Sequence, residues 1–214
     1  MITDRGKGMG TETEIRNVIF DIGEVIVTWR PREYMRARFG EERGGALFDA
    51  VFGHPYWREH IDYGYKDEKE HFEAMRGFSP ALAEDISERE RDWYGVYAPK
   101  TDTVRLIERL KAAGYGLYYL SNYPEHSFRY VLENNPVFRL MDGGVVSWQV
   151  HAVKPDPAIY RALLDRYGLA AGTCVFTDDS PLNTAGARAC GLHTVDFTGA
   201  AQLEQALSEL GLRF

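Results

Sequence analysis

Cysteine is almost absent from this chain. Only Cys174 and Cys190 occur in 214 residues, and they fall in one predicted strand and one predicted helix rather than in a spaced framework. A disulfide scaffold or a cysteine-based metal site needs several cysteines at suitable spacings. Both residues are therefore interpreted as reduced core cysteines.

Long apolar runs are also missing. No stretch approaches the roughly 20 apolar residues that a membrane-spanning helix needs. Residues 1–14 are polar and contain glycine, without the apolar centre of a signal peptide. These features predict a cytoplasmic protein with no membrane partner, and a flexible tail over residues 1–14 that takes no part in the fold.

Basic residues are fewer than acidic residues. The sequence has 25 Lys and Arg against 32 Asp and Glu, which gives a formal net charge of -7. Affinity for nucleic acid depends largely on clustered Lys and Arg, so no nucleic-acid partner is expected. A local basic pocket for a small anion is still compatible with this composition.

The sequence does contain short apolar runs that alternate with amphipathic segments. The runs predict strands at Val18–Phe20, Gly116–Leu120, Gly144–Ser147, Cys174–Phe176 and His193–Phe197. The segments between the last four runs carry helical periodicity. Helices that each end at a glycine are predicted over residues 103–113, 158–167, 184–190 and 201–210. This alternation predicts an α/β fold with a doubly wound parallel sheet.

Residues 31–99 interrupt the alternation. The segment is rich in aromatic and charged residues and shows no convincing buried strand. A crossover between parallel strands normally takes about a dozen residues, so a segment several times longer is expected to form a small helical cap domain inserted after the first strand. The predicted organisation is a catalytic core over residues 15–30 and 100–214 with a cap over residues 31–99, a position that suits a lid.

Polar groups with related chemistry follow the predicted strands. They are Asp21, the pair Ser121-Asn122, Lys154 before Pro155-Asp156, and the pair Asp178-Asp179. Phosphoryl transfer needs a nucleophile, positive charge and hydrogen-bond donors around the phosphate. Asp21 is the candidate nucleophile, and Lys154 would neutralise phosphate charge. The acidic pair offers the oxygen ligands that Mg²⁺ prefers.

Each group taken alone has a simpler explanation. Asp21 could form a turn, Lys154 could be a solvated loop lysine, and Ser121-Asn122 could cap a helix beginning near Glu125. Adjacent carboxylates are harder to explain, because they repel each other unless a cation or proton intervenes. In combination at one edge of the sheet, these groups favour a magnesium-assisted phosphate site.

These motifs and their spacing resemble the haloacid dehalogenase (HAD) superfamily over nearly all of residues 17–197. The likeness is to the subfamily with a helical cap after the first motif. The run Phe20-Asp21-Ile22-Gly23-Glu24-Val25-Ile26-Val27, followed by Trp29-Arg30-Pro31, is similar to the glucose-1-phosphatase-like branch. The resemblance implies a Rossmannoid core and a magnesium-dependent phosphatase. Its substrate would be a small phosphorylated metabolite, such as a sugar phosphate, hydrolysed through an aspartyl-phosphate intermediate.

The resemblance also implies roles for individual residues. Catalysis would use Asp21, Ser121 and Lys154. The phosphate would be bound by Ile22, Gly23, Ser121, Asn122 and Lys154. The Mg²⁺ ion would be held by the Asp21 carboxylate, the Gly23 main-chain carbonyl, Asp178 and Asp179, with Asp179 favoured for direct contact.

One position departs from the phosphatase pattern. Most phosphatases of the superfamily have a second Asp two residues after the nucleophile, as general acid and base, where this chain has Gly23. General acid–base catalysis is typically worth about 10²–10⁴-fold. Glu24 is the nearest carboxylate, but its position in the chain favours a side chain directed away from the site. His54, His60 and Asp62 are alternatives, each more simply explained as structural. A site without a strong acid would favour leaving groups that need little protonation, such as that of a sugar 1-phosphate.

Other functions are compatible with parts of this pattern. In a 2-haloacid dehalogenase the same Asp attacks carbon without a metal, although the fourth motif of such enzymes usually lacks the acidic pair. Receiver domains of signalling proteins carry a similar set of groups, but in the reverse order and without an inserted cap. The glycine at position 23 is also compatible with a degenerate phosphate-binding protein with little turnover. Magnesium-dependent turnover would separate these possibilities.

Residues of the cap and its neighbours would set the specificity of a capped enzyme, since the lid closes over the leaving group. The candidates are Trp29, Arg30, Tyr56, Trp57 and His126. Aromatic residues more often pack in a core than bind a ligand, so each also has a structural explanation. The assembly is expected to be a monomer or a homodimer.

Overall fold

The computed structural model describes residues 14–91 and 93–214. The tail expected over residues 1–14 therefore lies, apart from Glu14, outside the described residues. In the described part, one parallel sheet has the strand order β3-β2-β1-β4-β5. The strands are β1 Asn17–Phe20, β2 Gly116–Ser121, β3 Gly143–Val146, β4 Cys174–Asp178 and β5 His193–Asp196. The predicted α/β fold is confirmed, with small shifts at the strand ends.

The central strand explains how the sheet is built. Strand β1 pairs with β2 on one side and with β4 on the other, and its residues Val18, Ile19 and Phe20 have no exposed surface. All residues of β4 are buried as well. Strands covered on both faces need nearly continuous apolar sequence, which accounts for the apolar runs that identified them.

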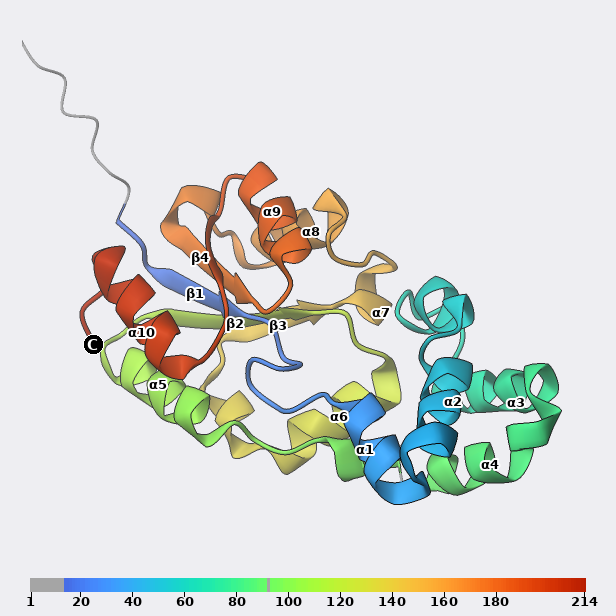
Figure 1. Ribbon diagram of the computed structural model, residues 1–214. Coiled ribbons are helices and arrows are strands. Elements are labelled where there is room, and N and C mark those ends of the chain that lie inside the picture. Colours follow the sequence, from blue (N-terminus) through green and yellow to red (C-terminus); the bar gives the residue numbers. More distant parts are fainter. Residues whose placement is uncertain (1–13, 92) are drawn as a thin grey trace, which may run out of the picture.

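Helices cover both faces of this sheet (Figure 1). One face carries α5 Thr101–Ala112, α6 Glu125–Asn134 and α10 Ala200–Glu209. The other carries α8 Pro157–Tyr167 and α9 Pro181–Ala189. Side chains of β1 alternate between the two layers, since Val18 and Phe20 pack in the first and Ile19 in the second. The sheet is therefore doubly wound.

Several ends of these elements follow from local sequence. Helix α8 begins where the Asp156 carboxylate accepts a hydrogen bond from the main-chain N–H of Ala158 at 2.8 Å, and it ends at Gly168 in the left-handed conformation (φ 62°). Ser147 was expected to end the third strand but instead begins the short helix α7 Ser147–Val150. Cys174 and Cys190 are both free; Cys174 is buried in β4, and Cys190 caps the end of α9.

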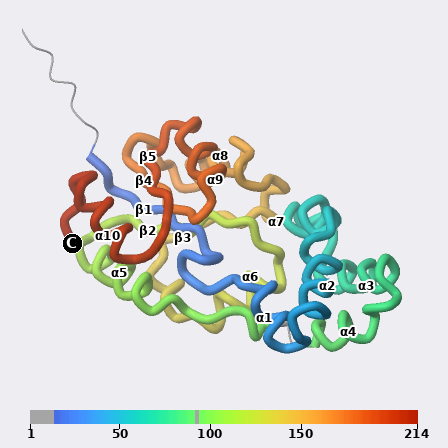
Figure 2. Tube along the Cα trace, viewed as in Figure 1, coloured from blue at the N-terminus to red at the C-terminus, as the bar shows by residue number. Residues whose placement is uncertain are grey.

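Residues 31–91 form a separate group of helices. They are α1 Pro31–Phe39, α2 Glu41–Val51, a π-helical turn Trp57–Ile61, α3 Glu68–Phe78 and α4 Ala83–Arg91. Short 3₁₀ turns lie at Pro80–Leu82, Trp93–Val96, Pro136–Leu140 and Ala171–Thr173. The helices share their own apolar cluster, which includes Met35, Leu47, Met75 and Ile86. Figure 2 shows them grouped at the end of the molecule opposite the C-terminus, beyond the carboxyl ends of the strands.

This helical segment, residues 31–96, is tied to the core by its linkers and by side-chain contacts. Its two connections run side by side: the Thr28 main-chain N–H donates to the Ala98 carbonyl at 2.8 Å, and that of Lys100 to the Ile26 carbonyl at 2.9 Å. Farther along, the buried Glu68 carboxylate accepts hydrogen bonds from the Ser127 hydroxyl at 2.6 Å and the Ser127 N–H at 2.8 Å. The His151 ring also lies 2.7 Å from the Tyr63 carbonyl. The segment thus meets the core through its linkers, through the first turn of α6 and beside His151.

None of the helices in the described part of the chain combines the length and apolar character that a membrane span requires.

Close packing of α1 on α2 depends on Gly44. A Cβ atom at this position would lie 2.3 Å from the Met35 carbonyl oxygen. We expect Gly44→Ala to lower the free energy of unfolding by about 1–3 kcal/mol, because the backbones must move apart. Gly45→Ala is the matched control, since its Cβ would lie 3.7 Å from the Arg36 guanidinium. That change should stabilise the helix by up to about 1 kcal/mol. Urea unfolding of both variants checks the prediction, and equal effects would contradict it.

Candidate active site

The motifs singled out in the sequence come together at the carboxyl edge of the sheet. Asp21 directly follows β1, Ser121 ends β2, and Asp178 ends β4 with Asp179 next to it; Lys154 lies in the loop between α7 and α8. Strands β1, β2 and β4 are neighbours in the sheet. Parallel neighbours end at the same edge, so residues far apart in sequence share one site.

Lys154 is the centre of this site. Its ammonium nitrogen lies 2.7 Å from Asp21 Oδ1 and 2.6 Å from Asp178 Oδ2. The Ser121 hydroxyl donates a hydrogen bond to Asp21 Oδ1 at 2.5 Å. All four side chains are buried, with Asp178 fully so. Since buried charges are tolerated when paired, the two carboxylates and the ammonium depend on one another.

The protonation of these groups reflects burial and the balance of charge. Burial raises the pKa of Asp21 to about 6; the Lys154 charge opposes this shift, and the Asp178 charge adds to it. Burial disfavours the charged form of Lys154, but Asp21 and Asp178 outweigh it and raise the pKa of the ammonium. The pKa of Asp179 is also raised, by burial and by its neighbour Asp178. Three carboxylates therefore compete for a single ammonium.

This excess of negative charge fits a cation. Asp21, Asp178 and Asp179 each offer a carboxylate oxygen, and these oxygens all lie within 4.8 Å of one another. Gly23, whose carbonyl was expected to complete the set, lines the same cavity. Donors that are all oxygen suit Mg²⁺. The residues present thus match the chemistry of a magnesium site.

Asparagine side chains hold the charged groups in place. The Asn122 carboxamide makes two hydrogen bonds to the main chain of Lys154, accepting from its N–H at 2.7 Å and donating to its carbonyl at 3.1 Å. Asn183, in the first turn of α9, donates to both Asp178 oxygens at 3.0 and 3.1 Å. Sequence reasoning missed Asn183. A signal was available, because an Asn in the first turn of the helix after an acidic pair can reach back to it.

The simpler explanation of Ser121-Asn122 as a helix cap is wrong. Helix α6 begins at Glu125, and its N-cap is Pro124, which has no side-chain capping bond. The Ser121 and Asn122 side chains instead contact Asp21 and Lys154. Ile22, expected to help bind phosphate, has a fully buried side chain. Its carbonyl accepts hydrogen bonds from the N–H groups of Ile26 and Val27.

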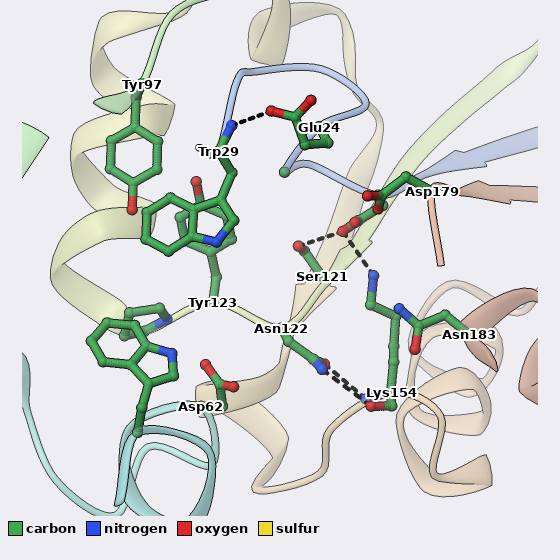
Figure 3. Close-up of a pocket in the computed structure, with 14 residues that line it drawn as sticks. Glu24, Trp29, Asp62, Tyr97, Ser121, Asn122, Tyr123, Lys154, Asp179 and Asn183 are labelled. Atoms are coloured by element: carbon green, nitrogen blue, oxygen red, sulfur yellow. Dashed lines mark hydrogen bonds and ion pairs between the residues drawn. The ribbon is translucent and has the colours of Figure 1, made fainter. Parts of the chain in front are cut away.

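A cavity of about 230 Å³ opens above these groups. Besides Asp21, Gly23, Ser121, Asn122, Lys154, Asp179 and Asn183, its lining residues are Glu24, Trp29, Trp57, Asp62, Tyr97, Tyr123 and Pro124. Figure 3 shows the polar groups of the sheet edge on one side and aromatic rings on the other, with the Asp62 carboxylate pointing into the space between them. The cavity therefore has a charged floor and a largely aromatic wall.

Glu24 lies beside this cavity, but its carboxylate is bound to three other groups. Its carboxylate accepts a hydrogen bond from the Trp29 main-chain N–H at 2.6 Å and pairs with Arg30 at 3.1 Å and Lys100 at 3.2 Å. Burial favours its neutral form, yet these contacts outweigh burial and lower the pKa of Glu24. Glu24 is among the lining residues of the cavity, and its carboxylate is turned to the Trp29 N–H, where it fastens the loop that follows Asp21.

The candidate leaving-group contacts divide into two sets. Trp29 and Trp57 line the cavity. Arg30, Tyr56 and His126 are not among its lining residues: Arg30 pairs with Glu24, Tyr56 packs edge-on against His60, and the His126 main-chain N–H donates to Glu68. His54 and His60 are not in the lining either; His54 stacks on Phe78, and His60 packs against Tyr56. Of the three alternative acids, only Asp62 is among the lining residues.

Comparison with known proteins identifies the family. Residues 15–191 match the haloacid dehalogenase-like hydrolases. The chain belongs to this family. As a HAD-like hydrolase, it is an enzyme, and the superfamily expected from the motifs is confirmed.

Relatives of this HAD-like hydrolase include phosphatases and dehalogenases. The sesquiterpene phosphatase astK of Aspergillus oryzae is 24% identical over 187 residues, which cover 86% of this chain and 92% of that protein. The (S)-2-haloacid dehalogenase 4A of Burkholderia cepacia is 26% identical over 122 residues, which cover 57% of this chain and 53% of that protein.

A solved structure has the same fold. The HAD family enzyme from Bacteroides thetaiotaomicron, in complex with magnesium and inorganic phosphate, is 21% identical and superimposes with a TM-score of 0.63. The match covers 85% of this chain and 93% of that chain.

Magnesium is expected to stabilise the folded HAD-like hydrolase. A ligand present at 100 times its Kd adds about 2.7 kcal/mol, so the Tm should rise when Mg²⁺ replaces EDTA. Asp179→Asn should lose most of this rise. Without Mg²⁺ this variant should be no less stable than the wild type, because it removes a carboxylate beside Asp178. Asp165→Asn, on the exposed side of α8, is the control and should keep the full rise. A full rise in Asp179→Asn would exclude Asp179 as a ligand.

Proposed function

We propose that this enzyme is a magnesium-dependent phosphatase that hydrolyses a small phosphorylated metabolite through an aspartyl-phosphate on Asp21. The observation that carries the proposal is the cluster of Asp21, Asp178 and Asp179 around Lys154 at the floor of a cavity. A monoester phosphate carries negative charge that a cation and an ammonium together can offset. Three carboxylates without a cation would repel it.

Each residue of the site has a role in this proposal. Asp21 attacks phosphorus, and the Ser121 hydroxyl orients its carboxylate through the hydrogen bond at 2.5 Å. Lys154 offsets charge on the transferring phosphoryl group, while the Asn122 carboxamide fixes the Lys154 main chain. The main-chain N–H groups of Ile22, Gly23 and Asn122 complete the phosphate cradle.

A bound Mg²⁺ would be held by Asp21, the Gly23 carbonyl, Asp178 and Asp179, and would supply positive charge next to the phosphate oxygens. Asp179 is the member of the acidic pair favoured for direct contact, since it is the more exposed of the two and Asp178 is occupied by Lys154 and Asn183.

The helical segment is proposed to be the cap of a subfamily I enzyme in the glucose-1-phosphatase-like branch. Its domain would comprise residues 31–99, inserted between core segments 15–30 and 100–214. Two observations support this: the segment has its own apolar cluster, and Trp57 and Asp62 contribute to the cavity. Closing such a segment over the substrate excludes water and determines which leaving groups fit.

The aromatic wall favours a sugar phosphate as substrate. Trp29 and Tyr97 stack at 5.3 Å between ring centroids, and Trp57 faces the same cavity. Flat rings can pack against the apolar face of a sugar, while Asp62 can accept hydrogen bonds from its hydroxyls. The Aspergillus oryzae relative is a sesquiterpene phosphatase, so an apolar alcohol is the competing leaving group, and a substrate panel should contain both.

A second candidate is a 2-haloacid dehalogenase, which the Burkholderia cepacia relative suggests. The charges of the side chains in the cavity argue against this reaction. A haloacid brings a carboxylate of its own, and the only cationic side chain among the described residues that line the cavity is Lys154, already paired with Asp21 and Asp178. Release of chloride from 2-chloropropionate without metal would favour this alternative over the phosphatase.

Phosphate release should require both Mg²⁺ and Asp21. We expect turnover of glucose 1-phosphate, glucose 6-phosphate, an isoprenoid phosphate or p-nitrophenyl phosphate in Mg²⁺, and none in EDTA. Asp21→Asn should lower the rate by more than about 10³-fold, because the amide cannot attack phosphorus. Asp165→Asn should be unchanged. The measurement is inorganic phosphate over time. A wild-type rate that survives in Asp21→Asn would sink the proposal. No turnover with any substrate would leave a dehalogenase or a phosphate-binding protein, and chloride release from 2-chloropropionate would then separate these two.

A further inference from the structure

We infer that Asp62, from the helical segment, is the general acid and base of this enzyme, an inference that rests on the proposed phosphatase function. The position two residues after Asp21 is Gly23 and carries no proton donor. Breaking the bond to an alcohol leaving group leaves charge on its oxygen unless a proton arrives. A group that can exchange protons must therefore reach into the cavity from elsewhere.

Elimination among the lining residues leaves Asp62. Within the described part of the chain, the titratable groups of the cavity are Asp21, Glu24, Asp62, Tyr97, Tyr123, Lys154 and Asp179. Asp21 is the proposed nucleophile and Asp179 a proposed metal ligand. Burial raises the pKa of both tyrosines, to values at which they hold their protons. Lys154 is held between two carboxylates.

Glu24 fails for a different reason. Its carboxylate is occupied by the Trp29 N–H, Arg30 and Lys100, which together lower its pKa. A carboxyl with a lowered pKa is ionised near neutral pH and has no proton to give. Moving it toward a substrate would also break the contacts that fasten the loop after Asp21.

Asp62 is held in place by contacts with Trp57. It directly follows the π-helical turn Trp57–Ile61, and its main-chain N–H donates to the Trp57 carbonyl at 3.1 Å. The Trp57 indole also donates a hydrogen bond to the Asp62 carboxylate. Trp57 in turn packs edge-on against Phe52 at 5.0 Å and His71 at 4.9 Å. Figure 3 shows the carboxylate directed into the cavity, toward the side that holds Ser121 and Asn122.

The surroundings of Asp62 also suit proton exchange near neutral pH. Burial raises the pKa of Asp62 to about 7, against the indole hydrogen bond of Trp57 and the positive charges of Arg58 and Lys154. Asp62 keeps partial exposure because it faces the cavity. An acid–base catalyst works best with a pKa near the working pH.

The two chemical steps then balance. Asp21 forms a bond to phosphorus while the bond from phosphorus to the leaving oxygen breaks, and that oxygen takes the electron pair together with the Asp62 proton. The ionised Asp62 next removes a proton from a water whose oxygen attacks the phosphorus of the aspartyl-phosphate. Inorganic phosphate leaves, the Asp21 carboxylate is restored, and Asp62 is again protonated.

Substrates with different leaving groups test this role. Asp62→Asn should lower the rate for glucose 6-phosphate by about 10²–10⁴-fold, since its alkoxide needs a proton. With p-nitrophenyl phosphate the nitrophenolate leaves unaided, so its first-turnover burst should fall by less than about 10-fold, while the later, water-dependent phase slows. Glu59→Gln, an exposed carboxylate in the same turn, is the matched control and should retain wild-type rates with both substrates.

The ratio of the two rates decides the outcome, because it does not depend on the fraction of folded enzyme. A ratio of first-turnover rates that shifts by 10-fold or more toward p-nitrophenyl phosphate supports Asp62 as the acid. An unchanged ratio overturns the role, whether both rates fall together or neither does. Asp21→Asn is assayed alongside: if wild-type turnover does not require Asp21, the proposed function itself has failed, and the Asp62 role fails with it.

Discussion

The ammonium of Lys154, held between the carboxylates of Asp21 and Asp178, is the contact on which the rest of the site depends. It joins the ends of β1 and β4 to the loop before α8 through two ion pairs of 2.7 and 2.6 Å. A buried carboxylate without a partner costs several kcal/mol, and the lysine offsets this cost for both acids. The pairing is incomplete, because Asp179 adds a third negative charge beside them. The same cluster is thus both a structural link across the sheet edge and an unbalanced charge that draws in a cation.

The loop after Asp21 joins the core to the helical segment through contacts of Glu24. Glu24 adopts a left-handed conformation with φ 54°, which turns its carboxylate back onto the Trp29 N–H. Lys100 reaches across from the returning linker to bind both the Glu24 carbonyl, at 2.7 Å, and its carboxylate. The two linkers that lead into and out of the helical segment are therefore held together at the same point, a few residues from the proposed nucleophile. A non-glycine residue at positive φ persists when its surroundings hold it there, and here three hydrogen-bond partners do so.

Placing proton transfer on the helical segment would couple substrate enclosure to catalysis. In such an arrangement the core holds the nucleophile, ammonium and cation ligands, while the segment supplies Trp57 and Asp62. Glu68 ties this segment to the first turn of α6 through Ser127 and His126, where the positive end of a helix favours a carboxylate. A substrate that fits the aromatic wall would meet the acid in position. A substrate that keeps the segment from packing on the core would reach the phosphate-binding groups but would lack a proton donor. Selectivity would then arise at the transition state as well as in binding.

The sequence by itself determined the strands of the sheet and which polar residues follow them. The apolar runs predicted each strand of the sheet, and parallel strands must end at a common edge, so the positions of Asp21, Ser121 and Asp178 along the chain were enough to group them. Their adjacency follows from topology. The paired linkers, the Asn122 and Asn183 contacts and the role of Glu24 could not be obtained in this way, because each depends on a side-chain direction set by neighbours distant in sequence. The tertiary structure alone decided that Asp62 faces the cavity while His54 and His60 do not. These three residues lie close together in the chain, and what separates them is the irregular π-helical turn and the packing of Trp57 on Phe52 and His71, which no periodicity in the sequence encodes.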